Sequence, residues 1–358
     1  MKKILVLLLS IILILTYSGC SNSEKASTGI GSRTLNVYNW GQYLSLGEEG
    51  YIDVLKEFTK ATGIKVNYNV YDSNESMYTK LETGGTSIDI VIPSDYMIER
   101  LIENDMLLKI NYDNVPNFKY VDKEFKNLNY DPTNEYSVPY TYGTVGIIYN
   151  KKYVKEPVDS WNVLWNQNYK GKVLMFDNPR DAFGVAQTLL GYDVNNCTKE
   201  QYEHCFKKLV EQKPIVQQYV MDQIFEAMVS EEAWIAPYYA GDYFIMLEDN
   251  ENLAFAYPKE GFNYFVDALC IPKSCKNKEE AEAFINFLCD PKISGKNMEY
   301  VGYSSPISKA KEYMDPEIAN DPITYPSKKQ LKKAYMFKNV SNDILQYVNN
   351  LWLKVKIS

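Results

Sequence analysis

The sequence predicts an α/β protein that folds into two domains. Its 358 residues exceed what one ordinary hydrophobic core accommodates. Strand-like and helix-like segments alternate along the chain, which is typical of parallel sheets covered by helices. A long strand-like segment at residues 136–150 has Gly143 in its middle and separates two such alternating regions. We therefore expect two α/β domains joined by crossing segments.

The first alternating region begins with the strand-like stretch TLNVYNW at residues 34–40. The helix expected at 51–63 places its apolar residues on one face and ends at Gly63, a common stop signal. The apolar run at 87–94 shows no polar alternation, which indicates a strand buried on both faces. The other elements expected here are a strand at 64–71 and helices at 73–85 and 95–105.

The second alternating region ends with a strand at 264–272, which would carry the chain back to the first domain. A helix is expected from about Lys328 to the C-terminus. The other expected elements are strands at 172–176 and 233–239 and helices at 178–192, 199–212 and 277–291. The expected domains are 34–142 plus 264–311, and 143–263 plus 312–358.

Residues 1–19 have the features of a bacterial secretion signal, with two lysines followed by an apolar run. That run is shorter than the about 20 residues that a membrane span needs. The stretch YSGC resembles the lipobox of bacterial lipoproteins, although Tyr17 stands where that box usually has Leu. We therefore expect a lipid anchor on Cys20, with ordinary secretion as the alternative. Residues 20–33 are polar and are expected to form a flexible tether to the outer face of the cytoplasmic membrane, or in the periplasm.

The composition argues against several classes of function. Removal of residues 1–19 changes the formal net charge from −8 to −10, which repels nucleic acid and attracts cationic solutes. His204 is the only histidine, and no CxxC pair is present, which argues against zinc sites and His-dependent catalysis. We expect a protein that is not an enzyme and that uses no cofactor or metal. The 31 tyrosines suit aromatic cages around cations.

A two-domain α/β chain with an export signal has the layout of a solute-binding protein, whose domains close around a ligand. Ligands of open α/β sheets lie beyond the carboxyl ends of the strands. Trp40 and Tyr43 follow the first expected strand, with core packing as the alternative role. Ser94 and Tyr96 follow the third strand, and Asp95 between them is expected to be a helix N-cap.

Two strand ends in the second region place polar and aromatic side chains together. Asn178 is expected to cap a helix, and Asp181 can complete a capping box or contact a ligand. Tyr238 and Tyr239 adjoin each other, and Asp242 follows. Adjacent tyrosines would bind ferric ion through two phenolates or form the wall of an aromatic cage around a cation. We favour the cage.

Asp267 is the most informative single residue. It shares the face of an apolar strand with Phe265 and Leu269, and no Lys or Arg lies within four residues of it. Burying an unpaired carboxylate costs several kcal/mol. A cationic ligand is therefore the expected partner of Asp267, with a distant arginine as the alternative.

Several stretches of the sequence resemble the spermidine/putrescine-binding lipoproteins of bacterial ABC importers. They occur in the order of that family from about Thr34 onward, and they include YNWGQYL, DIVIPSDYMIERL, YSVPYTYGTVGIIYN, YKGKVLMFDNPRDAFG, YPKEGFNYFVDALCIP and VGYSSPIS. The resemblance implies a type II periplasmic-binding-protein fold, with a ligand cleft and two hinge crossings. It also implies a monomer that delivers a polyamine to a membrane permease driven by an ATPase subunit.

The resemblance carries ten ligand-binding positions onto this chain. Six match the residue types of the family: Trp40, Tyr43, Ser94, Tyr96, Asp267 and Tyr303. Asp181 replaces a Glu of the spermidine binder and keeps the charge. Asn178 replaces a carboxylate, while Tyr239 and Phe265 replace Trp.

Gln42 also replaces a carboxylate of the family, and Phe337 replaces a Gln. Because only Asp181 and Asp267 remain as carboxylates at the matched positions, the sequence favours putrescine over the longer spermidine, with Asp95 or Asp242 as the alternative source of a third charge. The alternatives are another cationic solute or ferric ion in the same fold, an exported enzyme, and a polyamine sensor.

Overall fold

A computed structural model describes residues 33–358. The expected signal peptide, the lipid anchor at Cys20 and almost all of the expected tether lie outside the described residues. Among residues 33–358, no helix has both the length and the apolar character that crossing a membrane requires.

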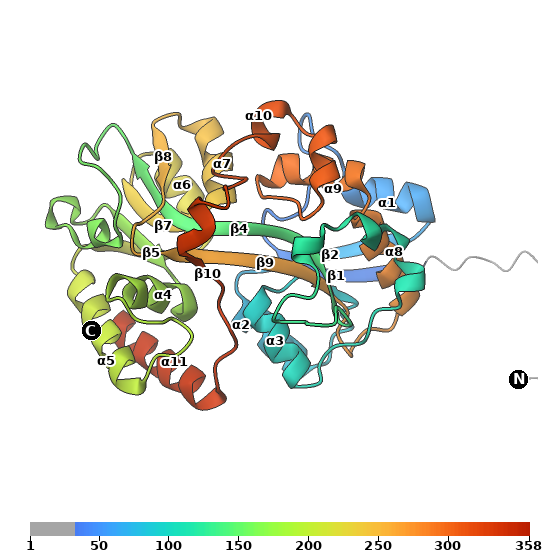
Figure 1. Ribbon diagram of the computed structural model, residues 1–358, viewed down its shortest axis with the longest axis horizontal. Helices are drawn as coiled ribbons and strands as arrows, with labels where there is room; N and C mark the ends of the chain where they lie inside the picture. Colours follow the sequence, from blue (N-terminus) through green and yellow to red (C-terminus); the bar gives the residue numbers. More distant parts are fainter. Residues whose placement is uncertain (1–32) are drawn as a thin grey trace, which may run out of the picture. The chain divides into compact units, whose positions relative to one another are not determined.

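The described chain is built around a single mixed sheet (Figure 1). Its path of neighbouring strands is β2-β1-β3-β9-β4-β7-β5-β6, with β8 added to β4 and β10 added to β9. The strands are β1 (Thr34–Trp40), β2 (Lys65–Tyr71), β3 (Ile90–Val91), β4 (Ser137–Asn150), β5 (Val173–Phe176), β6 (Val216–Val220), β7 (Ile235–Tyr239), β8 (Leu253–Ala256), β9 (Phe262–Cys270) and β10 (Ala334–Tyr335).

The sheet has two parallel flanks joined by an antiparallel centre. β1 pairs in parallel with β2 and β3, and β5 pairs in parallel with β6 and β7. The long strands β4 and β9 run antiparallel through the middle, and Figure 1 shows them spanning both flanks. Gly143 lies opposite Phe265 in this central pair. The prediction of a long strand around Gly143 and of a returning strand near Asp267 is therefore confirmed.

Two hydrophobic clusters lie along the sheet. One contains Phe58 and Phe284 and involves β1, β2 and β3, and the other contains Trp161 and Phe183 and involves β5 and β7. β4 and β9 contribute to both clusters, since Val138 belongs to the first and Ile147 to the second.

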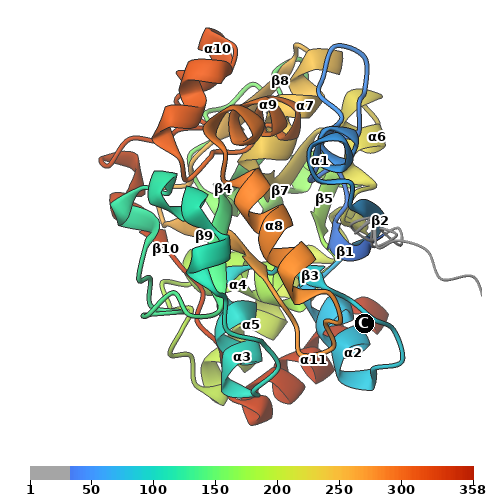
Figure 2. The same ribbon diagram turned by 90° about the vertical axis from the view of Figure 1, so that its right-hand side faces the viewer.

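Helices cover both sides of the sheet. Figures 1 and 2 agree in placing α2, α3, α5 and α11 on one side and α6, α7, α9 and α10 on the other. The helices are α1 (Val54–Thr62), α2 (Asn74–Thr83), α3 (Asp95–Glu103), α4 (Pro179–Leu189), α5 (Lys199–Gln212), α6 (Ile224–Val229), α7 (Ala240–Asp249), α8 (Lys278–Leu288), α9 (Pro291–Val301), α10 (Pro316–Ala319) and α11 (Asn342–Ile357).

Several helix ends follow the local sequence. Gly63 ends α1 in a left-handed conformation with φ of 72°, which glycine adopts without strain. Ser73 forms a capping box with Ser76 at the start of α2. Asn178 accepts a hydrogen bond from the N–H of Asp181 and so caps α4, as the sequence predicts.

Two sequence predictions are wrong. Asp95 is not an N-cap: Ser94 holds that position and Asp95 is the first helical residue of α3. The C-terminal helix begins at Asn342 and not near Lys328. The intervening chain includes β10, which pairs in parallel with β9 and satisfies backbone groups that a helix would have used.

Candidate functional site

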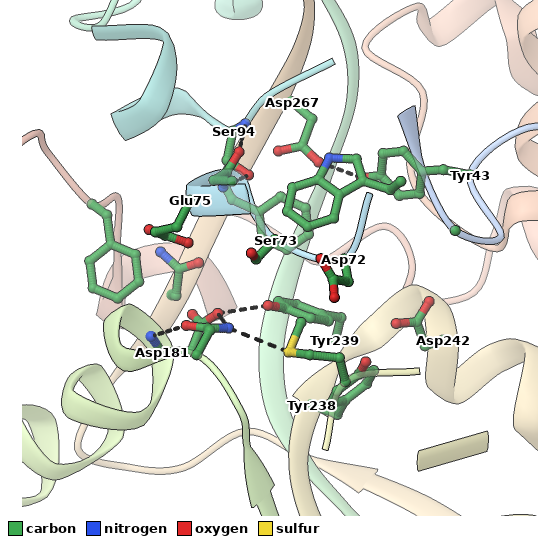
Figure 3. Close-up of a pocket in the computed structure, with 18 of the residues that line it drawn as sticks. Tyr43, Asp72, Ser73, Glu75, Ser94, Asp181, Tyr238, Tyr239, Asp242 and Asp267 are labelled. Carbon is green, nitrogen blue, oxygen red and sulfur yellow. Dashed lines mark hydrogen bonds between the residues drawn. The ribbon is translucent and has the colours of Figure 1, made fainter. Parts of the chain in front are cut away.

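One pocket lies where the parallel strands of both flanks end. Loops and helix starts that follow β1, β2, β3, β5, β6 and β7 converge there, and β9 adds side chains from its middle. The space between the atoms, including the part open to solvent, is about 760 Å³. Its lining residues, many of which Figure 3 draws, are Trp40, Gly41, Tyr43, Asp72, Ser73, Asn74, Glu75, Ser94, Asp95, Tyr96, Asn178, Asp181, Met221, Asp222, Tyr238, Tyr239, Asp242, Asn263, Phe265, Asp267, Tyr303 and Phe337.

The structure brings all ten sequence-predicted ligand-binding residues to this one pocket. They come from segments that are more than 260 residues apart in the chain, from Trp40 to Tyr303. This juxtaposition follows from the topology, because parallel strands present their carboxyl ends at the same edge.

The pocket is strongly acidic. Seven carboxylates line it, and its described lining contains no Lys, Arg or His. Four of the seven lie in the first turn of a helix: Glu75 in α2, Asp95 in α3, Asp181 in α4 and Asp242 in α7. The positive end of a helix dipole favours an ionised carboxylate at such a position. The helix starts therefore support a negative pocket.

Asp267 presents an unpartnered oxygen to the pocket. Its side chain is 3% exposed, and Oδ2 accepts a hydrogen bond of 2.6 Å from the hydroxyl of Tyr43. No group of the described chain hydrogen-bonds Oδ1, which is buried. Burial raises the pKa of Asp267 to about 7, although the nearby hydroxyl groups of Tyr43 and Ser94 oppose the shift. A ligand ammonium would satisfy this oxygen and favour the ionised form.

Asp181 accepts two side-chain hydrogen bonds on Oδ2. The hydroxyl of Tyr239 donates at 2.6 Å and Nδ2 of Asn178 donates at 2.7 Å. In a capping box, the carboxylate would instead accept from the backbone N–H of Asn178, so that expected role is not the one observed. Burial raises the pKa of Asp181. Figure 3 shows this carboxylate facing the space between Tyr239 and Glu75.

Glu75 is a pocket carboxylate that the sequence analysis missed. Its Oε1 accepts a hydrogen bond of 3.0 Å from the hydroxyl of Tyr96. Nδ2 of Asn74 donates to that hydroxyl and to Oγ of Ser94, each at 3.1 Å. Burial raises the pKa of Glu75, and the nearby charge of Asp181 adds to this. The rule of strand ends would have found Glu75, because it follows β2 directly.

The other carboxylates of the pocket, Asp242, Asp95, Asp72 and Asp222, differ in their exposure and in their electrostatic surroundings. Burial raises the pKa of Asp242 to about 8, while the Tyr303 hydroxyl lowers it. Burial also raises the pKa of Asp95 well above its ordinary value, although the backbone N–H groups of Tyr96 and Val266 oppose the shift. Asp72 and Asp222 are exposed at the rim of the pocket, and the charge of Asp72 adds to the burial that raises the pKa of Asp222.

A chain of aromatic rings covers the pocket walls. Tyr43 contacts Trp40 and Tyr303 with centroid distances of 6.5 and 5.3 Å, and Phe265 contacts Tyr303 and Tyr239 at 6.0 and 5.7 Å. All four contacts are edge-to-face, which is a favoured arrangement of aromatic pairs. The ring faces that remain free can contact methylene groups or ammonium groups of a ligand.

Glycines and backbone hydrogen bonds hold these rings in place. Nε1 of Trp40 donates to the carbonyl of Ile92 at 2.8 Å. A Cβ atom on Gly241 would lie 2.2 Å from the Tyr303 ring, and one on Gly143 would lie 2.7 Å from the Phe265 ring. The absence of side chains at these two positions is therefore what allows the rings to approach.

Gln42 and Phe337, which the resemblance aligns with polar ligand contacts of the family, differ in whether they line the pocket. Gln42 is exposed, does not line the pocket, and accepts a hydrogen bond of 2.9 Å from the Tyr300 hydroxyl. Phe337 lines the pocket from the extended chain after β10 and contacts Tyr96 edge-to-face at 6.2 Å. Gln42 therefore does not mark a lost charge inside the pocket.

The pocket carboxylates are dispersed. In the described part of the chain, no three His, Cys, Asp or Glu side chains form a group that could hold a metal ion. Figure 3 shows Glu75, Asp181, Asp242 and Asp267 at separate points around the space. This distribution of charge between aromatic faces can bind an elongated cation with several positive groups.

Comparison with known proteins assigns the family. A family model for bacterial extracellular solute-binding proteins matches residues 53–326. A spermidine/putrescine-binding periplasmic protein of Escherichia coli is 35% identical over 305 residues, which cover 85% of this chain and 86% of that protein. The putrescine-binding periplasmic protein SpuD of Pseudomonas aeruginosa is 31% identical over 344 residues, which cover 91% and 92%.

A solved structure gives the same result. The spermidine/putrescine ABC transporter substrate-binding protein PotD of Streptococcus pneumoniae aligns with a TM-score of 0.76 and 36% identity, over 91% of this chain and 99% of that chain. The expected solute-binding fold is confirmed. The chain belongs to the bacterial extracellular solute-binding protein family.

Proposed function

We propose that this protein captures a polyamine, putrescine or spermidine, outside the cell and delivers it to the permease and ATPase of an ABC importer. One observation carries the proposal: the pocket combines seven carboxylates, no cationic side chain among its described lining residues, and a wall of aromatic rings. The unpartnered Oδ1 of Asp267 is the point at which a ligand ammonium is most needed.

The ten predicted residues serve as ligand contacts in this proposal. Asp267 and Asp181 bind ammonium groups, while Trp40, Tyr43 and Tyr239 contact the methylenes and add cation–π attraction of roughly 0.5–2 kcal/mol each. The remaining contacts are Ser94, Tyr96, Asn178, Phe265 and Tyr303.

The tyrosine pair favours a polyamine over ferric ion. Burial raises the pKa of both Tyr238 and Tyr239 well above the ordinary value, which disfavours the phenolate form that ligates ferric ion. The Tyr239 hydroxyl also donates to Asp181 and is not free to ligate a metal. Ammonium groups need acceptors of the kind that Asp181 supplies.

The lining of the pocket bears on the length of the polyamine. The preference for putrescine that the sequence predicts depends on a count of two carboxylates, Asp181 and Asp267, and on Gln42 in place of a third. Glu75 and Asp242 also line the pocket, and Gln42 lies outside it. The charge count therefore permits a triamine as well as a diamine, and relatives named for either ligand are similarly close to this chain.

The two hydrophobic clusters support two lobes that close around the ligand. We place the lobes at residues 34–142 plus 264–311 and residues 143–263 plus 312–358. Met314, Ile318 and Ala319 pack with the first cluster, which supports moving the last boundary beyond residue 319.

The proposal also includes export, a lipid anchor at Cys20 and a monomeric state. The periplasmic relatives support export.

Calorimetric titration tests the proposal. Putrescine and spermidine should bind with a stoichiometry of one, and the ratio of their affinities ranks the two ligands. The control is 1,4-butanediol, which has the carbon chain of putrescine without its charges and should not bind. Absence of heat with putrescine, spermidine and spermine alike would refute polyamine capture.

A further inference from the structure

The chain uses arginine very sparingly. Of its 38 lysines and arginines, three are arginines: Arg33, Arg100 and Arg180. Arg100 and Arg180 line the same second cavity, which adjoins the main pocket and shares Glu75 and Tyr96 with it. Arginine differs from lysine in its planar fork of donors, which matches the oxygens of a carboxylate or phosphate.

Both guanidinium groups are held by aromatic rings and not by carboxylates. Cζ of Arg100 lies 4.3 Å from the centroid of Tyr78, and Cζ of Arg180 lies 4.3 Å from that of Phe337. Stacking on a ring leaves the edge of a guanidinium group, where its N–H donors lie, open for hydrogen bonds.

Donors of both arginines lack partners. Arg180 is 8% exposed and donates through one terminal nitrogen to Asn195 and to the carbonyl of Lys338. Nε of Arg180 and Nε of Arg100 are buried, and nothing within residues 33–358 accepts a hydrogen bond from either. A buried donor left without an acceptor destabilises the folded protein.

Glutamates near the cavity do not neutralise these arginines. Glu75 and Glu82 also line it, but Glu75 accepts from the Tyr96 hydroxyl and Glu82 is exposed. The ion pairs within 4.0 Å in the described chain include neither Arg100 nor Arg180. The cavity thus contains two guanidinium groups with open donors.

We propose that this second cavity is a binding site for an oxyanion, the carboxylate or phosphate group of a small molecule, held between Arg100 and Arg180. The space there, about 650 Å³, admits an oxyanion with a small organic group attached. Both arginines line this space, and neither forms an ion pair with a carboxylate of the described chain.

The site is coupled to the main pocket through the charge of Arg180, and this coupling rests on the proposed polyamine function. The positive charge of Arg180 repels a ligand ammonium near Asp181, which is its neighbour in α4. A bound oxyanion cancels that charge. Polyamine and oxyanion therefore increase the affinity of each other, as linkage requires.

The first test uses no polyamine. The melting temperature of the purified protein is measured in sodium phosphate, acetate and chloride at equal ionic strength, for the wild type, Arg100→Gln and Arg33→Gln. Arg33 is the matched control because it pairs at 3.6 Å with Glu280 and lies outside the cavity. We expect an oxyanion-dependent rise in the wild type and in Arg33→Gln, and its loss in Arg100→Gln.

The pattern of anions identifies the ligand group. A rise in phosphate alone assigns a phosphate group, and a rise in acetate assigns a carboxylate. No rise above chloride, or an equal rise in Arg100→Gln and Arg33→Gln, overturns the proposal whether or not a polyamine binds.

The second test measures the coupling. The active oxyanion should tighten putrescine or spermidine binding at least about twofold in the wild type and not in Arg100→Gln. Arg100 is preferred to Arg180 because Arg180 also contacts Phe337, which lines the polyamine pocket. Equal tightening in both proteins would place the anion effect elsewhere.

Discussion

Substitution of Asp267 by Asn should have opposite effects on stability and on binding. The pKa of this carboxylate is about 7 in the folded protein, and burial is the main cause. An unfolded Asp has a pKa near 3.9, so the shift is about 3 units, or about 4 kcal/mol at about 1.4 kcal/mol per unit. At pH 8 the unliganded protein therefore loses about that much stability by holding Asp267 ionised.

The sign of the pH dependence follows from the raised pKa. Below about pH 4 the carboxyl is protonated in both states and costs nothing, and the cost grows as pH rises towards 7. Asp267→Asn has no such charge. Without ligand, the variant should unfold at a higher denaturant concentration than the wild type at pH 8, and the difference should shrink at pH 4.

Binding should respond in the other direction. A charge-assisted hydrogen bond contributes about 1.5–3 kcal/mol. Its loss weakens the affinity for putrescine or spermidine by about 10-fold to 150-fold. Calorimetric titration and chemical unfolding of the same preparations measure both effects.

Asp89→Asn is the matched control. Asp89 is equally buried but lies outside the pocket, and Oδ2 accepts from the N–H of Asn36 at 2.8 Å. Burial would raise the pKa of Asp89, but backbone hydrogen bonds from Asn36 and Lys276 outweigh it and lower the pKa. Asp89→Asn should therefore lose stability at pH 7 and keep the ligand affinity. If Asp267→Asn behaved like this control, Asp267 would be a structural residue and the reasoning would fail.

Three further predictions concern the same pocket. Because the pKa of Asp267 is about 7 and that of Asp242 about 8, polyamine affinity should rise between pH 5.5 and 8.5, and binding should release protons. Calorimetry in two buffers with different ionisation heats detects the released protons. An affinity that does not change over this pH range contradicts the role of both carboxylates. Trp40→Ala should weaken polyamine binding by about 2-fold to 30-fold, because cation–π attraction is lost, and it should change the fluorescence response to ligand. An unchanged affinity would show that the Trp40 ring has only a packing role. Gln42→Glu should change polyamine affinity by no more than about twofold relative to the wild type, since Gln42 is exposed and hydrogen-bonded to Tyr300. A large gain in affinity would show that position 42 contacts the ligand.

The parts of the site that the sequence predicted are those with strong strand signals. β1, β5 and β7 read as apolar runs, and their ends gave Trp40 and Tyr239. The residues missed after β6, Met221 and Asp222, follow an edge strand whose sequence VQQYV has two adjacent exposed glutamines. A strand at the edge of a sheet carries little apolar signal, so its carboxyl end could not be located.

The position of Phe337 was predicted by the resemblance alone, and the extended conformation of its segment was not predicted. The chain from Lys328 has helix-forming residues, and helix propensity is a weak prior that tertiary contacts override. Pairing of Ala334 with Phe262 and of Tyr335 with Asn263 holds this segment extended. No local pattern records a pairing between residues about 70 positions apart, which is why the aromatic end of the pocket could be seen only in the structure.

The helix-borne carboxylates are distributed over both sides of the pocket. Glu75 and Asp95 start helices that pack in the first hydrophobic cluster, whereas Asp181 and Asp242 start helices that pack in the second. Each helix start stabilises its own carboxylate, but the charge of Asp181 raises the pKa of Glu75 and of Asp267 across the pocket. Like charges on the two sides therefore repel each other when both are ionised. In the proposed function, a polyamine between them replaces that repulsion with two attractions, and we expect close approach of the two sides to depend on the ligand.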